Sequence, residues 1–115
     1  MSLTPYLIAG ANRARGSQRH PRTLFSVPVM LHHLVPGGVR FTHGITLDIS
    51  EGGLGALVEN GLRAGETVSL EFDLPDYYMK AVAIVRHSSS ARSGFEFQSL
   101  TPEERQRIAS LVGNA

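Results

Sequence analysis

The alternation of apolar and polar residues between Phe25 and Asp48 limits most strongly how this chain can fold. A turn-forming segment, VPGGV, divides the alternation into two runs. A period of two is that of a β-strand, and Pro-Gly-Gly favours a tight reversal, so the sequence predicts a β-hairpin with both mostly apolar sets on one face. The two sets are Val27, Val29, Leu31, His33 and Val35, followed by Val39, Phe41, His43, Ile45 and Leu47.

Further short strands are expected beyond the hairpin, each bounded by Gly, Pro, Asn, Asp or Ser. Their spacing of roughly 8–12 residues is typical of a small antiparallel barrel or sandwich. We find no internal repeat and no low-complexity tract in the chain. The expected strands cover residues 54–58, 67–72, 79–86 and 95–97.

The C-terminal segment changes its period and predicts a helix. Thr101 is a suitable N-cap, Pro102 suits the first helical position, and Glu104 completes a capping box. Ile108, with Leu111 and Val112, then forms one apolar stripe that can pack on the strands. The sequence therefore predicts an all-β domain that is completed by a C-terminal α-helix.

Charge is distributed unevenly along the 115 residues. Residues 1–22 hold four of the 11 basic residues, all arginines, and no acid, whereas the remaining 93 hold seven basic and ten acidic residues, a net charge of −3. An acidic body repels polyanions, so any anion binding would depend on the basic segment. We expect a flexible basic arm over residues 1–17, one folded domain over 18–112 and a short tail over 113–115.

Several classes of protein are disfavoured by composition. The absence of cysteine excludes disulfides and thiolate metal sites and suits the cytoplasm. The apolar runs are too short for a membrane span, and no nucleophile elbow, phosphate-binding loop or His/Asp constellation suggests an enzyme. His33 and His43 are expected diagonal to each other on the hairpin's apolar face; a zinc site there lacks a third ligand, so partly buried, hydrogen-bonded histidines are favoured.

The segment LDISEGGLGA, residues 47–56, carries the most informative polar pattern. Asp48 and Ser50 lie two apart, so at the end of a strand their side chains can point the same way. Gly52 and Gly53 allow positive φ and close approach of a ligand or another chain. One interpretation is a tight turn in which Asp48 and Ser50 accept hydrogen bonds from the local backbone; the other is a ligand site.

The order of these segments resembles the PilZ domain family over roughly Ser17 to Val112. It runs from QRHPR through the apolar hairpin, DISEGG, alternating strands and SGFEF to a terminal helix. The resemblance implies a six-stranded antiparallel β-barrel with a C-terminal helix that binds cyclic di-GMP through an RxxxR motif and a [D/N]xSxxG motif. The second motif is intact here as Asp48, Ser50 and Gly53.

The first motif departs from the family pattern at one position. Counted back from the first strand, its second arginine is Arg22, but its first position is occupied by Gln18. Arg19 lies between them, and the RxxxR from Arg15 to Arg19 begins three residues too early. The site residues that the resemblance implies are Arg15, Gln18, Arg19, Arg22, Asp48, Ser50, Gly52 and Gly53.

The resemblance implies a cyclic di-GMP sensor that signals to a protein partner, as a monomer or weak homodimer, with no cofactor other than this ligand. The alternative is an adaptor that binds the nucleotide weakly or not at all, because Gln18 replaces an arginine. A nucleic-acid-binding module is disfavoured by the acidic body and by the lack of an arginine- or aromatic-lined strand face.

Overall fold

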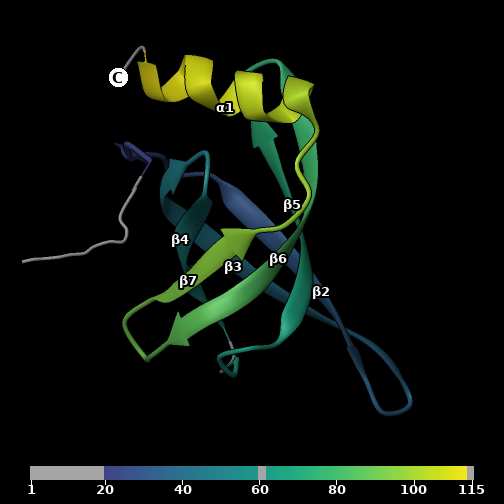
Figure 1. The fold of residues 1–115 in the computed structure, drawn as a ribbon. Coiled ribbons are helices and arrows are strands. Elements are labelled where there is room, and N and C mark those ends of the chain that lie inside the picture. The colour runs from purple at the N-terminus through teal and green to yellow at the C-terminus, as the bar shows by residue number, and fades with distance from the viewer. Residues whose placement is uncertain (1–19, 60–61, 114–115) are drawn as a thin grey trace, which may run out of the picture.

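The computed structural model describes residues 20–59 and 62–113 and shows a strongly curved sheet with one helix across an end (Figure 1). In this part of the chain there are seven strands and one helix. Their bounds are β1 Thr23–Leu24, β2 Pro28–Val35, β3 Gly38–Ser50, β4 Gly53–Val58, β5 Thr67–Leu74, β6 Tyr77–Ser88, β7 Ser93–Phe97 and α1 Pro102–Gly113.

The strands form one antiparallel sheet in the order β1-β3-β2-β5-β6-β7-β4, and an additional pairing of β3 with β4 closes it. The result is a closed six-stranded barrel to which the two-residue β1 is added, which confirms the predicted fold class. Every predicted strand is present, and most extend a few residues further at their ends. The extension of β3 continues through the expected break to Ser50, so that only Glu51 and Gly52 form the turn to β4.

The β2–β3 hairpin is present, but the prediction that both apolar sets share one face is wrong. Val35 pairs with Gly38 across a two-residue turn, so Leu31 pairs with Thr42. A two-residue turn joins odd-numbered positions to even-numbered ones, and a one-residue slip reverses every side chain. The second apolar set therefore faces outward, as the exposures of Val39 (50%), Phe41 (56%) and Ile45 (44%) show.

The turn chemistry explains this register. Pro36 suits the second position of a type II turn, and Gly37 takes the positive φ of 92° that its third position requires. Two inward positions on β3 are then occupied by the buried threonines Thr42 and Thr46, whose hydroxyls need hydrogen-bond partners. Thr46 has them, because its Oγ1 accepts from Val27 N at 2.8 Å and donates to the Phe25 carbonyl at 2.6 Å.

The two hairpin histidines are consequently on opposite faces, contrary to the prediction. His33 is buried, and its Nε2 accepts a hydrogen bond from Arg40 Nε at 3.2 Å. His43 is exposed opposite Met30 on the outer face. Among the described residues, no group of three or more His, Asp or Glu side chains is arranged to hold a metal ion.

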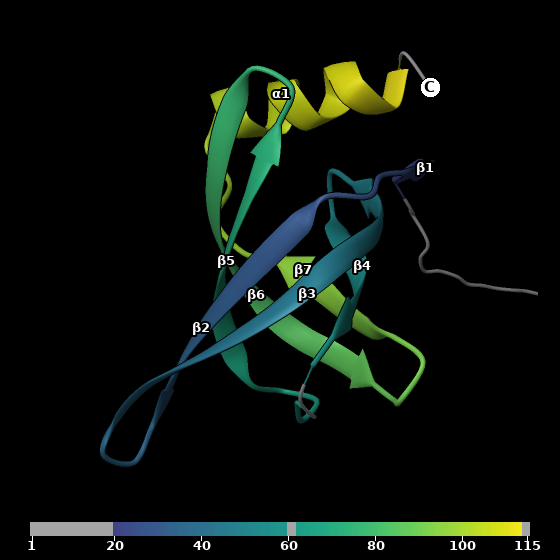
Figure 2. The same cartoon turned by 180° about the vertical axis from the view of Figure 1, so that it is seen from behind.

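Helix α1 lies across one end of the barrel, while the β2–β3 hairpin extends past the other (Figure 2). The predicted capping box is confirmed, because Thr101 Oγ1 accepts from Glu104 N at 3.1 Å and Glu104 Oε1 accepts from Thr101 N at 2.9 Å. Ile108 is fully buried in the barrel core, and Leu111 and Val112 pack against it partly buried. No helix in the described ranges is long and apolar enough to cross a membrane.

We predict that Ile108→Ala lowers the free energy of unfolding by about 2–5 kcal/mol, because it leaves a cavity where the helix meets the barrel. Urea denaturation followed by circular dichroism measures the loss. Ser110→Ala, at an exposed position of the same helix, should change stability by no more than about 0.5 kcal/mol. Equal losses in the two variants would show that the helix does not depend on this contact.

Candidate ligand-binding site

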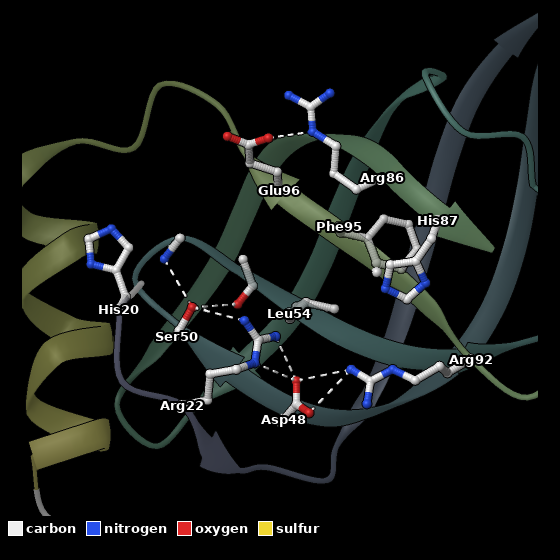
Figure 3. Close-up of a pocket in the computed structure, with 13 residues that line it drawn as sticks. His20, Arg22, Asp48, Ser50, Leu54, Arg86, His87, Arg92, Phe95 and Glu96 are labelled. Atoms are coloured by element: carbon white, nitrogen blue, oxygen red, sulfur yellow. Dashed lines mark hydrogen bonds and ion pairs between the residues drawn. The ribbon is translucent and has the colours of Figure 1, made fainter. Parts of the chain in front are cut away.

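An open pocket of about 560 Å³ lies beside the β3–β4 turn, where β4 and the β6–β7 hairpin come together (Figure 3). Most of the polar residues that the sequence singled out meet here. Five of the eight predicted site residues line the pocket, namely Arg22, Asp48, Ser50, Gly52 and Gly53. The other three, Arg15, Gln18 and Arg19, lie outside the described residues.

Arg22 connects the segment before β1 to the end of β3. Its Nη2 and Nε donate to Asp48 Oδ1 at 2.7 and 3.2 Å, and its Nη1 donates to Ser50 Oγ at 3.3 Å. The placement follows from strand pairing: Thr23 pairs with Ile49 and Leu24 with Asp48, so Arg22 arrives opposite Ser50. Residues more than 25 positions apart in the sequence thus form one hydrogen-bonded group.

Asp48 and Ser50 also make the local contacts expected of a strand-end turn. Asp48 Oδ1 accepts from Gly55 N at 3.2 Å, and Ser50 Oγ accepts from Gly52 N at 3.1 Å. The two interpretations of this segment are therefore compatible. The backbone amides orient the same oxygens that face the arginine.

Gly53 is required by the close approach of another strand, and its φ is not positive. It pairs with Glu96 of β7, and a Cβ at this position would lie 1.9 Å from the carbonyl oxygen of Phe95. Any side chain would therefore separate β4 from β7. Gly52 is more open, and a Cβ there would meet the ring of His20 at 2.9 Å. His20 is exposed and is one of the residues that line the pocket.

The Asp48 carboxyl is shared by two arginines. Arg92 Nη2 lies 3.2 Å from Asp48 Oδ2, on the side away from Arg22 (Figure 3). Burial alone would raise the pKa of Asp48, but the hydrogen bond and charge of Arg22, and then those of Arg92, outweigh it and lower the pKa below its ordinary 3.8. Asp48 is therefore a carboxylate at neutral pH.

Sequence reasoning missed the wall of the pocket that β6 and β7 contribute. Arg86 pairs there with Glu96 across the two strands, and Phe95 lines the same pocket. Arg92 is 44 positions from Asp48, so no local spacing could join the two. Arg92 could have been predicted as a site residue from its position directly before SGFEF, had that strand been placed next to the strand that follows the DxSxxG motif. The residues missed are Arg86, His87, Arg92, Gly94, Phe95 and Glu96.

Comparisons with known proteins agree with this architecture. The family model of the PilZ domain matches residues 16–114. A search of curated proteins by sequence gives no match. Solved structures with the same fold include the Bacillus subtilis inhibitor of motility, MotI/DgrA, at 18% identity and a TM-score of 0.69, covering 87% of this chain and 51% of that one. The chain thus spans about half the length of the Bacillus protein.

Two isolated domains are also similar. The PilZ domain of Escherichia coli YcgR, solved with c-di-GMP, has 15% identity and a TM-score of 0.68, covering 86% of this chain and 91% of that one. The PilZ domain of CeSA from a cellulose-synthesizing bacterium has 19% identity and a TM-score of 0.63, with coverages of 81% and 95%. At these low identities the likeness concerns the fold alone.

The lowered pKa of Asp48 predicts a pH-dependent contribution to stability. A carboxyl with a lowered folded-state pKa stabilises the fold above its unfolded pKa, and this contribution is lost as the pH falls through the folded value. We expect Asp48→Asn to have a lower free energy of unfolding than the wild type near neutral pH. This difference between the two proteins should become smaller below about pH 4. Ser50→Ala removes a contact of the same arginine with a neutral hydroxyl. Its free energy of unfolding should therefore lie below that of the wild type by the same amount at neutral and at acidic pH.

Urea denaturation of the wild type, Asp48→Asn and Ser50→Ala at a series of pH values measures the stability difference of each variant from the wild type. A gap for Asp48→Asn that stays constant down to the most acidic condition would contradict the expected contribution of the ionised carboxylate.

Proposed function

The chain belongs to the PilZ domain family, and from this premise we propose that it is a cyclic di-GMP receptor domain that passes the nucleotide signal to a protein partner. One observation carries the proposal. Arg22 of the first motif contacts Asp48 and Ser50 of the second motif, at the edge of an open pocket. The structure of Escherichia coli YcgR in complex with c-di-GMP, in which 45% of the chain matches this fold, supports the choice of ligand.

The residue types suit the chemistry of this nucleotide. Cyclic di-GMP presents two phosphates and two guanines, and a guanidinium matches both a phosphate and the O6/N7 edge of guanine bidentately, which an ammonium cannot do. Residues 1–22 contain four arginines and no lysine. Asp48 would accept from a guanine N1–H or N2–H, and Ser50 would add a hydroxyl contact.

The signal would be transmitted by binding rather than by catalysis. PilZ domains generally act as receptors or adaptors, so we expect no enzymatic activity. The basic segment that contains Arg15, Gln18 and Arg19 would contact the nucleotide and so present a changed surface to the partner. A polymer of nucleic acid is not the expected ligand, because residues 23–115 carry a net charge of −3.

A second function, that of an adaptor without nucleotide binding, is favoured by one residue. Gln18 occupies the position of the first motif arginine, and its amide donates hydrogen bonds but carries no charge. Such an adaptor would bind its partner equally with and without cyclic di-GMP. The two functions therefore differ in a direct titration.

We expect isothermal titration calorimetry to detect binding of cyclic di-GMP to the wild-type protein. Arg22→Ala should weaken it by roughly ten- to hundred-fold, because a hydrogen bond to a charged group contributes about 1.5–3 kcal/mol. Arg63→Ala is a matched control, since it removes one positive charge at an exposed position outside the pocket. Absence of heat up to high micromolar nucleotide would refute the receptor function and leave the adaptor.

The position of Gln18 in the motif generates a separate prediction. Gln18→Arg restores the RxxxR spacing with Arg22 and should tighten cyclic di-GMP binding by about tenfold or more. The same titration measures the change. Unchanged or weaker affinity would mean that the motif is aligned to the wrong residue.

A further inference from the structure

We infer that Arg92, which belongs to neither PilZ motif, is a third arginine of this site and binds the dinucleotide from the wall opposite Arg22. The inference rests on the proposed function and adds a specific residue to it. Four observations carry it: the position of Arg92, its unused donors, the space provided for its guanidinium, and the charge it adds to the pocket.

The backbone of Arg92 is held in place by the β6–β7 turn. Ser89 N donates to the Arg92 carbonyl at 2.9 Å, and Ser89 Oγ accepts from Arg92 N at 3.3 Å. Ser93 follows directly and begins β7, which pairs with β4. The side chain therefore starts from a fixed point at the pocket wall and points toward Asp48 (Figure 3).

Arg92 has more unused donors than Arg22, which uses three of its five N–H groups. All three guanidinium nitrogens of Arg22 donate to Asp48 or Ser50. Of the Arg92 nitrogens, Nη2 alone contacts Asp48, and within the described part of the chain the buried Nε has no hydrogen-bond partner. A buried donor without a partner is costly unless water or a ligand completes it. The side chain is 39% exposed and thus accessible from the pocket.

The neighbouring strand leaves room for this guanidinium. A Cβ at Gly55 would lie 1.8 Å from Arg92 Nη2 and 3.0 Å from Asp48 Oδ1. The guanidinium therefore lies against bare backbone, at a distance that no side chain at position 55 would permit. Gly55 N also donates to Asp48, so one glycine accommodates both members of the ion pair.

Arg92 also determines the sign of the charge in the described pocket. The charged residues that line it form two oppositely charged pairs, Arg22 with Asp48 and Arg86 with Glu96, and Arg92 adds a third cation. With the histidines neutral, the described lining has a net charge of +1, and it would be neutral without Arg92. A ligand with two phosphates needs that excess, all the more because Gln18 contributes no charge.

The test is a set of cyclic di-GMP titrations by calorimetry on the wild type and three Arg92 variants, with Arg63→Ala as the control of equal charge. We expect Arg92→Ala and Arg92→Gln to weaken binding by about tenfold or more. Arg92→Lys should weaken it less, because lysine keeps the positive charge but lacks the planar guanidinium that donates two parallel hydrogen bonds. Arg63→Ala should remain within about twofold of the wild type. Thermal unfolding without nucleotide verifies that each variant is folded.

Arg92→Gln separates ligand binding from a purely structural role, because its amide can still donate to Asp48. If Arg92 served only to hold Asp48, this variant would bind nearly as well as the wild type, and that result would overturn the inference while leaving the receptor function intact. Should Arg92→Ala not fold, the glutamine and lysine variants decide the matter alone. A wild-type protein that gives no binding would instead refute the receptor function itself.

Discussion

The site depends on a single carboxylate that two arginines share. Asp48, at the end of β3, joins the segment before β1 to the β6–β7 hairpin, because Arg22 and Arg92 donate to its two oxygens from opposite sides. Without this negative charge, the two guanidiniums would repel each other across the pocket. Hydrogen bonds of this charged kind contribute more than an exposed ion pair, which is worth about 0–1 kcal/mol. Their main effect here is to fix the positions of the two guanidinium groups, which lie on either side of one cavity.

The barrel provides the geometry that this carboxylate requires. β3 pairs with β1 on one edge and with β4 on the other, so its last residues contact both neighbours. β4 in turn pairs with β7, and Gly53 lets the two backbones approach closely. The site is thus placed at a junction of four strands, and helix α1 covers the core at one end of the barrel through Ile108. The polar residues of the site, such as Arg22 and Asp48, lie outside the hydrophobic core, whereas Leu54 and Phe95 belong both to the core and to the pocket wall.

The sequence predicted the elements better than their faces, for a physical reason. A period of two and a capping box are local, and the strands and the helix appear where these patterns lie. Which face of β3 points inward depends on the length of the turn, and the two-residue turn at Pro36-Gly37 reversed the expected assignment. The motif residues Arg22, Asp48 and Ser50 meet as the family resemblance implied. Arg92 was not predicted, because its contact with Asp48 exists only after β3, β4 and β7 have paired.

The distribution of charge favours a small anion over a polymer. Electrostatic interactions in solution are screened over about 8–10 Å at physiological ionic strength. A dinucleotide bound in the pocket, as proposed, would lie within that distance of Arg22 and Arg92, where the local excess of positive charge dominates. A polymer would extend beyond it, over a body in which acidic residues outnumber basic ones by ten to seven after residue 22, and would be repelled there. The proposed preference for a compact, doubly charged ligand therefore agrees with where the charges lie, although the net charge of the whole chain is only +1.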